Sequence, residues 1–287
     1  QGIMGREYVS RQGGDAAIAD AVCEHYMPRF AGDSLPSTPL GAVLAIADKM
    51  DALVGYFAIG MIPSGSADPF ALRRQALGII QIHRQWKVQV SINELARQAY
   101  RLHSVSGKLK FDEEKTVCEV VNFVNGRLKM LLEEAGVEHD IVDAAISVPS
   151  TFPAKIMSVA KVLTTMRGDK RFEEFVTMFS RVRNIAVNAQ GDHYDPKVLV
   201  EDAEVSLIEA FDKFKDTYTN DMASDSNEAD IADYIEGSCG LTETVNQFFE
   251  SVMVMSEDPV IKGNRLGLLK SIQNTLALVA DYSKITF

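Results

Sequence analysis

Apolar residues recur at intervals of three and four along most of the chain, and this spacing constrains the fold more than any other feature of the sequence. The period places apolar side chains on one face of an α-helix, where neighbouring helices can bury them. Strand-like alternation is scarce, its best example being residues 86–92. We therefore predict an all-α fold. Three sets show the helical spacing: Val117, Val120, Val121, Val124, Leu128, Leu131 and Leu132; Leu241, Val245, Phe248, Phe249 and Val252; and Leu266, Leu269, Ile272, Leu276 and Val279.

Two Asp-Pro pairs, Asp68-Pro69 and Asp258-Pro259, are predicted to begin helices. Asp can cap free backbone amides, and Pro fits the first helical turn without losing a needed donor. The acidic residues 217–233 are poor in large apolar groups and are predicted to form a mobile loop. Breaks between helices are predicted where polar residues, Pro or Gly cluster, at residues 63–68, 104–110, 149–153 and 190–196.

The charge of the chain is acidic, with 29 Lys and Arg against 40 Asp and Glu and a net charge of -11. A nonspecific nucleic-acid binder usually carries a basic face that displaces phosphate counterions, so this charge argues against that class. The acidity is concentrated in residues 181–287, which hold 9 Lys and Arg against 19 Asp and Glu. A local basic surface would nevertheless be sufficient to hold an RNA loop.

Three further features indicate the setting of the protein. No run approaches the roughly 18 consecutive apolar residues of a membrane span, so we expect no membrane partner. The three cysteines are odd in number and far apart, which fits neither a disulfide framework nor zinc-ligand spacing and favours the cytoplasm. A chain that begins at Gln1 rather than Met is expected to be part of a longer one.

Asp48 and Asp51 lie one helical turn apart beside an apolar stripe. This spacing resembles the last helix of HD-type metal-dependent phosphohydrolases, in which such an Asp completes a metal cluster and His25 would be a further ligand. The alternative is a pair of acids on a helix surface. Because His25 is the only histidine before Asp48, we predict no metal site and keep His25 and Asp48 as the alternative. No glycine-rich phosphate loop or catalytic triad spacing is found either, so no catalytic residue is assigned.

Several strings, taken together and in order, resemble the beta subunit of the two-subunit bacterial glycyl-tRNA synthetases. The most specific is IPSGSADPFALRR at 62–74, which combines a Gly-Ser turn, an Asp-Pro pair and two arginines. The resemblance runs essentially from end to end. The other strings are QGIMGREY at 1–8, EHYMPRFAGDSLP at 24–36, ADKMD at 47–51, RVRNI at 181–185 and VMVMSEDPVIKGNRLGLL at 252–269.

The resemblance implies three parts, all helical. They are the end of an HD-like domain over residues 1–75, a linker or body over 76–180, and an anticodon-binding DALR-like bundle over 181–287. In the family the HD-like domain departs from the metal-ligand set of the hydrolases, and the catalytic core belongs to the alpha subunit. The resemblance therefore implies a tRNA-binding piece of a glycine-tRNA ligase that is inactive alone. Its partners would be glycine tRNA and the alpha subunit, and ATP and Mg would bind to that subunit.

One candidate tRNA-binding face lies around Arg181. A helix through Arg181 and Asn184 places both on one face, where an amide can read a base edge and a guanidinium can stack on a base or hold a phosphate. Arg183 adds charge nearby, and Arg167, Lys170 and Arg171 precede it. The alternative for these cations is ordinary pairing with the abundant acids. The stripe of Phe172, Phe175 and Phe179 is predicted to be core.

A second candidate cluster comprises Lys262, Arg265 and Lys270, beside helix amides from Asp258 onward that can hold an anion. Tyr194, in a polar loop, is a candidate for stacking on a base. Arg73 and Arg74 are candidates either for a phosphate on the acceptor side of the tRNA or for an ion pair with Asp48 or Asp51. Two other functions stay open: an HD-type phosphohydrolase, which would need metal, and a helical scaffold that binds no nucleic acid.

Overall fold

A computed structural model describes residues 2–65, 67–105, 107, 109–148, 152–199, 201–219 and 226–287. The chain forms two compact units, and each is described by itself. Unit 1 comprises Gln1–Leu131 with Ser150–Ala154, and unit 2 comprises Leu132–Pro149 with Lys155–Phe287. The described residues are helical apart from turns, loops and one isolated bridge between Ser64 and Ala67, and the predicted all-α fold is confirmed. No helix in this described part is long and apolar enough to cross a membrane.

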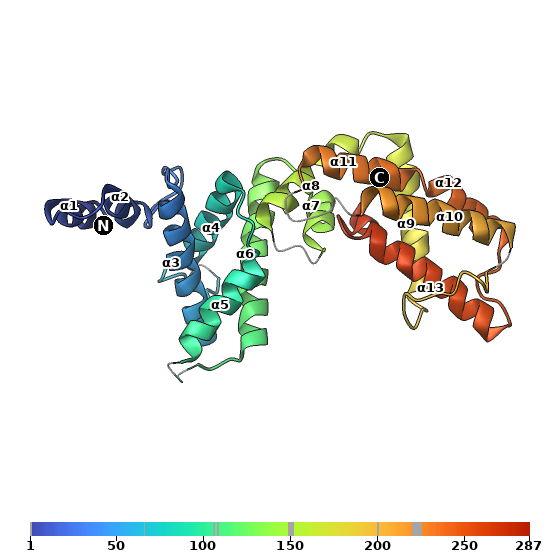
Figure 1. Cartoon of the computed structure of the whole chain (residues 1–287), viewed down its shortest axis with the longest axis horizontal. Helices are drawn as coiled ribbons and strands as arrows, with labels where there is room; N and C mark the ends of the chain where they lie inside the picture. The colour runs from blue at the N-terminus through green and yellow to red at the C-terminus, as the bar shows by residue number, and fades with distance from the viewer. Residues whose placement is uncertain are drawn as a thin grey trace. The chain divides into compact units, whose positions relative to one another are not determined.

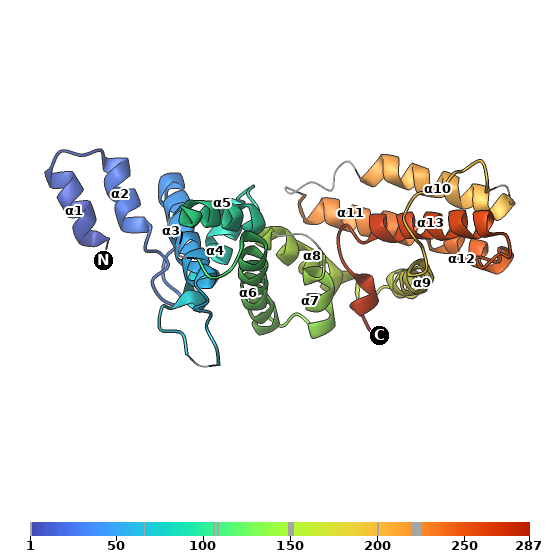
Figure 2. The same ribbon diagram turned by 90° about the horizontal axis from the view of Figure 1, so that it is seen from below.

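Unit 1 is built around α3, which packs against α2, α4 and α5 (Figure 1). The side chain of Thr38 caps its first turn, and Pro39 occupies the first helical position. Small side chains such as Ala42 and Ala45 are buried on α3, which allows close approach of its neighbours. Figure 2 shows α1 and α2 as an antiparallel pair. The helices are α1 (Ile3–Arg11), α2 (Ala16–Glu24), α3 (Pro39–Ala58), α4 (Leu72–Trp86), α5 (Ile92–Ser104) and α6 (Glu113–Glu134), whose last turn belongs to unit 2.

Unit 2 is a helical bundle in which α9 packs against α11, α12 and α13. Figures 1 and 2 show α10, α12 and α13 side by side, with α9 crossing them. Phe172, Phe175 and Phe179 on α9 are buried against Tyr282, so their predicted place in the core is confirmed. The elements are α7 (His139–Ile146), α8 (Pro153–Met166), whose first two residues belong to unit 1, α9 (Lys170–Ala186), α10 (Asp202–Tyr218), α11 (Glu228–Cys239), α12 (Thr242–Ser251), α13 (Pro259–Leu276) and the 3-10 turn η1 (Tyr282–Lys284).

The two Asp-Pro pairs behave differently. Asp258 caps α13 by accepting hydrogen bonds from the amides of Val260 and Ile261, as predicted. The prediction at Asp68-Pro69 is wrong by one turn, because α4 begins at Leu72. Asp68 still accepts hydrogen bonds from the amides of Leu72 and Arg73, so the cap reaches the helix across an intervening turn.

The predicted three-part division differs from the two units. Its boundaries at 75/76 and 180/181 fall inside α4 and α9, whose continuous backbone hydrogen bonds make a boundary there unfavourable. The strand-like residues 86–92 end α4, form a turn and begin α5. Much of the acidic stretch 217–233 is helical, since α10 ends at Tyr218 and α11 begins at Glu228. Residues 220–225 of that stretch, and 149–151 of the predicted break at 149–153, lie outside the described residues.

Candidate nucleic-acid interface

Arg181 and Asn184 are exposed on the same face of α9, one helical turn apart. The guanidinium of Arg181 lies 4.2 Å from the centroid of the Phe249 ring on α12. A cation held over an aromatic face is stabilised by the ring quadrupole, which limits the conformations of the long side chain. The structure therefore places an exposed guanidinium and an exposed amide on one face, as the sequence predicted, and it adds the support of Phe249, which the sequence did not predict.

Arg183 points away from this face. It donates hydrogen bonds to both carboxylate oxygens of Asp281, at 2.8 and 2.9 Å, and to the hydroxyl of Ser283. All three bonds come from Nη1, and charge-assisted hydrogen bonds of this kind are strong. Arg183 therefore anchors the C-terminal segment on α9 and does not share the face of Arg181, and its contact with tRNA stays a prediction.

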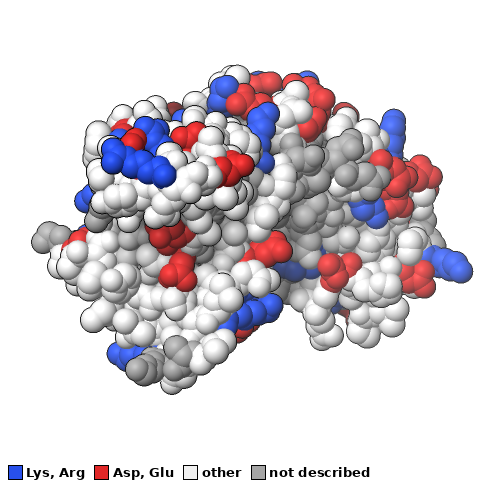
Figure 3. Space-filling model, turned by 60° about the vertical axis from the view of Figure 1, so that its left-hand side comes forward, with Lys and Arg blue, Asp and Glu red and all other residues white. Residues whose placement is uncertain are grey.

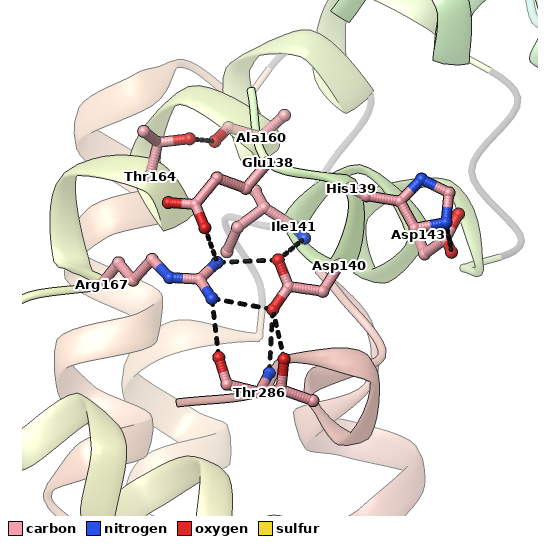
Figure 4. Close-up of polar contacts among 9 residues, drawn as sticks. All are labelled: Glu138, His139, Asp140, Ile141, Asp143, Ala160, Thr164, Arg167 and Thr286. Atoms are coloured by element: carbon pink, nitrogen blue, oxygen red, sulfur yellow. Dashed lines mark hydrogen bonds and ion pairs between the residues drawn. The ribbon is translucent and has the colours of Figure 1, made fainter. Parts of the chain in front are cut away.

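Arg167 anchors the same segment from another side (Figure 4). It makes two hydrogen bonds to the carboxylate of Asp140, at 2.7 and 2.9 Å, and donates a third to the carbonyl of Thr286. The amide and hydroxyl of Thr286 donate to the same carboxylate, and Glu138 adds an ion pair. Arg167 is thus a structural cation rather than part of a free basic surface.

The Asp140 anchor predicts an acid-sensitive contribution to the stability of unit 2. Burial alone would raise the pKa of Asp140, but the hydrogen bonds from Arg167 and Thr286 outweigh burial and hold the pKa well below its usual range. Because the folded-state pKa is depressed, the stabilisation is present above the unfolded pKa of about 3.9 and is lost as pH falls below it.

In urea unfolding, Asp140→Asn is expected to lower the free energy of unfolding by about 1.5 to 3 kcal/mol at pH 7. The difference from wild type should shrink steadily between about pH 4 and pH 2, because the Asp140 carboxylate of the unfolded chain takes up a proton there while that of the folded chain stays ionised. A difference that stayed constant over this range would show that the charge of Asp140 does not contribute.

Lys170 and Arg171 lie exposed at the start of α9. Lys170 pairs with Glu174 at 3.7 Å, one turn along the same helix, and such exposed pairs contribute little energy. Arg171 lines a hollow between α10 and α11 and has no ion-pair partner in the described part of the chain. Both side chains are accessible, and Arg171 is the less engaged of the two.

The three cations of the second predicted cluster, on α13, differ in burial: Arg265 is buried, whereas Lys262 and Lys270 are partly exposed. Arg265 is buried and donates to Glu204 at 2.6 Å, to Glu201, and to the carbonyl of Met253 at 2.9 Å. The prediction of a tRNA contact is wrong for Arg265, because its charge is neutralised inside the bundle. Asp258 already occupies the helix amides predicted to hold an anion. Lys262 is partly exposed, and Lys270 donates to Gln273 at 3.0 Å.

Tyr194 is half-buried rather than free in a polar loop. The segment around it lies directly against α13 at Gly267. A Cβ added to this glycine would lie 2.2 Å from the carbonyl oxygen of His193, so only a residue without a side chain allows such close contact. Asn264 accepts a hydrogen bond from the amide of Asp195 at 2.6 Å. Burial raises the pKa of Tyr194. The segment is therefore held against the bundle, and stacking of Tyr194 on a base stays a prediction.

The two candidate arginines of unit 1, Arg73 and Arg74, donate hydrogen bonds to backbone carbonyls. Arg73 donates to the carbonyl of Gly65 at 2.7 Å, and Arg74 donates to that of Arg29 at 3.0 Å. Neither arginine pairs with Asp48 or Asp51 in the part of the chain that the structure describes, so the predicted ion pair is wrong. The acceptor-side contact stays a prediction.

His25 and Asp48 do not form part of a metal cluster. The Nδ1 atom of His25 lies 2.8 Å from the carbonyl oxygen of Val22, and Lys49 donates to the carbonyl of His25 at 2.9 Å. Burial lowers the pKa of Lys49 to about 8. Over the described residues, no group of three or more His, Cys, Asp and Glu side chains is placed to hold a metal ion.

Surface charge is mixed. On the face drawn in Figure 3, Lys and Arg side chains are interspersed with Asp and Glu, and the coloured residues form no broad basic area. This distribution agrees with the net charge of -11. A nucleic-acid interface on this face would therefore rest on a few cations rather than on a broad basic area.

Two models of known protein families match this chain. Residues 1–147 match the family model described as "Glycyl-tRNA synthetase beta subunit". The chain belongs to this beta-subunit family. A second model, described as "DALR anticodon binding domain", matches residues 176–285, which include the Arg181 face and helices α10 to α13.

Relatives named glycine–tRNA ligase beta subunit match the whole chain. Identity is 40% over 287 residues for Clostridioides difficile, 38% over 285 residues for Syntrophomonas wolfei and 36% over 299 residues for Shouchella clausii. These alignments cover 99 to 100% of this chain but only 41% of each relative. The chain thus spans less than half the length of the beta subunits that it matches.

In this beta-subunit chain, sequence reasoning missed the role of Phe249. The apolar spacing assigned both Phe248 and Phe249 to the apolar face of their helix. In the structure Phe248 is fully buried, whereas Phe249 is half-buried and its ring supports the guanidinium of Arg181. The available signal was its position next to Phe248, which places it about 100° around the helix and at the edge of the apolar face. The arginine that it supports lies far away in sequence, so the pairing itself carried no local signal.

Proposed function

We propose that this chain is the tRNA-recognition part of a glycyl-tRNA synthetase beta subunit and that it binds the anticodon loop of glycine tRNA through unit 2. The observation that carries the proposal is the match of residues 176–285 to an anticodon-binding domain, over the helices that present Arg181 and Asn184. The relatives are named as subunits of a ligase. Attachment of glycine would then occur on an alpha subunit that binds ATP and Mg, and this chain alone would be inactive.

The Arg181 face has the chemistry that an unpaired RNA base requires. Anticodon bases are unstacked and are gripped by stacking on aromatic or guanidinium planes and by hydrogen bonds to their edges. Phe249 holds the guanidinium of Arg181 in place, so less conformational entropy is lost when a base stacks on it. Asn184 lies one turn away and can donate to and accept from a base edge.

The proposal is tested by fluorescence anisotropy with labelled glycine tRNA and with the same tRNA carrying a replaced anticodon. Arg181→Ala is expected to weaken binding to glycine tRNA by about 5- to 150-fold, the range of one lost base-stacking contact. Lys161→Ala is the matched control, because Lys161 is an exposed cation of the same unit paired with Glu228. Equal binding of both tRNAs would contradict anticodon recognition, and equal effects of the two substitutions would contradict the Arg181 face.

The same titration, repeated over a range of salt concentrations, measures the number of phosphate contacts. Each phosphate contact on a single strand contributes a slope of about -0.7 in a plot of log K against log salt. A small local interface on an acidic protein should give a modest but clear slope. A flat response would show that the basic groups make no phosphate contact.

A further inference from the structure

A cavity in unit 1 lies between α3, α4 and the segment that joins α2 to α3. Its volume is about 330 Å³, and sites for small molecules usually have volumes of about 300 to 1,000 Å³. Because the cavity lies outside unit 2, the inference drawn from it does not depend on the function proposed above. Its polar and charged lining residues are Tyr26, Arg29, Asp48, Lys49, Arg74 and Gln75.

Lys49 reaches this cavity from the core of unit 1. Only 4% of the residue is exposed. A Cβ added to Gly78 would lie 3.0 Å from Cε and 3.2 Å from Cδ of Lys49, so the lysine stem crosses α4 at a residue without a side chain. The amine donates a hydrogen bond to the carbonyl of His25 at 2.9 Å. The fold therefore makes room for this amine and holds it at the cavity wall.

The charge of Lys49 is not balanced by an acid. In the part of the chain that the structure describes, Lys49 forms no ion pair, and the adjacent Asp48 is exposed. A buried charge is usually paired, because an unpaired one has lost its hydration. Arg265 of unit 2 shows the usual arrangement, with two carboxylates against its buried guanidinium. A buried ammonium without an acid, at the wall of a cavity, favours an anionic ligand.

Two exposed arginines add donors at the same cavity. Arg74 donates through Nη1 to the carbonyl of Arg29 at 3.0 Å, and its Nε and Nη2 atoms have no acceptor within the described ranges. Arg29 uses Nε and Nη2 on Asp33, which leaves its Nη1. With Lys49, the donors come from three separate segments. They suit a phosphate monoester, which has three free oxygens, better than a carboxylate or an RNA phosphodiester, which have two.

We propose that this cavity binds a small phosphate monoester, whose phosphate group is held by Lys49 together with Arg29 and Arg74. The cavity is much larger than a phosphate ion, which leaves room for a small organic group beside the phosphate. The cations of the chain hold the ligand without a metal ion, and no bond of the ligand is broken. This site therefore differs from that of an HD-type phosphohydrolase in both its ligating groups and its chemistry.

Isothermal titration calorimetry of the 287-residue chain with glycerol phosphate tests the proposal. The dissociation constant is expected to be about 1 mM or lower, and acetate at the same ionic strength should bind about 10-fold more weakly or not at all. Lys49→Met keeps the apolar stem on Gly78 and removes the charge, and it should weaken binding by about 10- to 100-fold. Arg74→Gln changes an exposed residue and should weaken binding about 10-fold.

Two further variants show whether charge at the cavity is responsible. Asp48→Asn removes the acid that lines the cavity and should tighten binding by about 2- to 10-fold. Arg84→Gln is the matched control, because Arg84 is an exposed arginine of α4 that does not line the cavity, and it should bind as wild type does. Circular dichroism of each variant checks that the helices are retained.

Four outcomes would overturn the proposal. Wild type could bind neither glycerol phosphate nor inorganic phosphate, or Lys49→Met and Arg74→Gln could both bind as tightly as wild type. Loss of binding on addition of a metal chelator would indicate a metal site instead. Displacement of glycerol phosphate by glycine tRNA, together with weaker tRNA binding by Lys49→Met, would show that the cavity holds a phosphate of RNA rather than a small molecule.

Discussion

Replacing Arg265 with alanine is expected to lower the free energy of unfolding of unit 2 by about 3 to 5 kcal/mol. The side chain of Arg265 is 7% exposed and that of its partner Glu204 is 2% exposed. Removing the guanidinium would leave Glu204 buried without its cation, at the capping box that begins α10. Urea unfolding followed by circular dichroism measures the loss. Fluorescence of Trp86, the single tryptophan, reports on unit 1 and should change much less.

A double variant separates the buried charge from simple loss of packing. Arg265→Met combined with Glu204→Leu replaces both members of the pair by apolar groups of similar size, and it should recover most of the lost stability. Arg181→Ala, an exposed arginine of the same unit, should stay within about 0.5 kcal/mol of wild type. A loss below about 1 kcal/mol in Arg265→Ala would show that Glu204 finds water or another partner when the guanidinium is removed, and would contradict the structural role of this ion pair.

Tyr282→Ala is expected to cost about 3 to 5 kcal/mol, the range for removing a large buried aromatic side chain. Tyr282 is fully buried, and its ring centroid lies 4.8 Å from that of Phe175 and 5.3 Å from that of Phe179. It therefore holds the C-terminal segment on α9, together with the anchors at Arg167 and Arg183. The denaturation midpoint of unit 2 measures the effect.

Tyr282→Phe serves as the control, because it is not expected to lower the free energy of unfolding. The Tyr282 hydroxyl is buried and has no hydrogen-bond partner among the described residues, and burial raises its pKa well above the usual value. Removing an unsatisfied buried hydroxyl keeps the ring contacts and is expected to be neutral or to stabilise the unit by up to about 1 to 3 kcal/mol. A clear destabilisation by Tyr282→Phe would show that the hydroxyl is hydrogen-bonded in solution.

Much of the fold could be predicted because helix formation depends mainly on residues close together in the sequence. The apolar period from Val117 to Leu132 and the Asp258-Pro259 start both lie within a few residues of the structure that they predict, and both are found there. The start of α4 was misplaced because Asp68 caps its amides from four residues before Leu72. That longer approach depends on the turn between them, which residue types alone do not specify.

The candidate site was less predictable. Arg181, Arg183 and Arg265 look alike in sequence, since each lies on an amphipathic helix with acidic residues nearby. Their environments differ because Arg181 meets Phe249, Arg183 meets Asp281, and Arg265 meets Glu204, all distant in sequence. The local sequence pattern therefore predicts an accessible cation correctly only where the fold places no acidic side chain from a distant part of the chain beside it.

The sequence by itself determined the all-α class, the core role of the phenylalanines of α9 and the beta-subunit family, because helical periodicity and family strings are properties of the order of residues. Only the tertiary structure decided which arginines remain at the surface and where a cavity opens beside Lys49. The physical reason is that burial and ion pairing depend on which helix faces meet, and those contacts join residues far apart in sequence, such as Glu204 and Arg265, which are 61 positions apart.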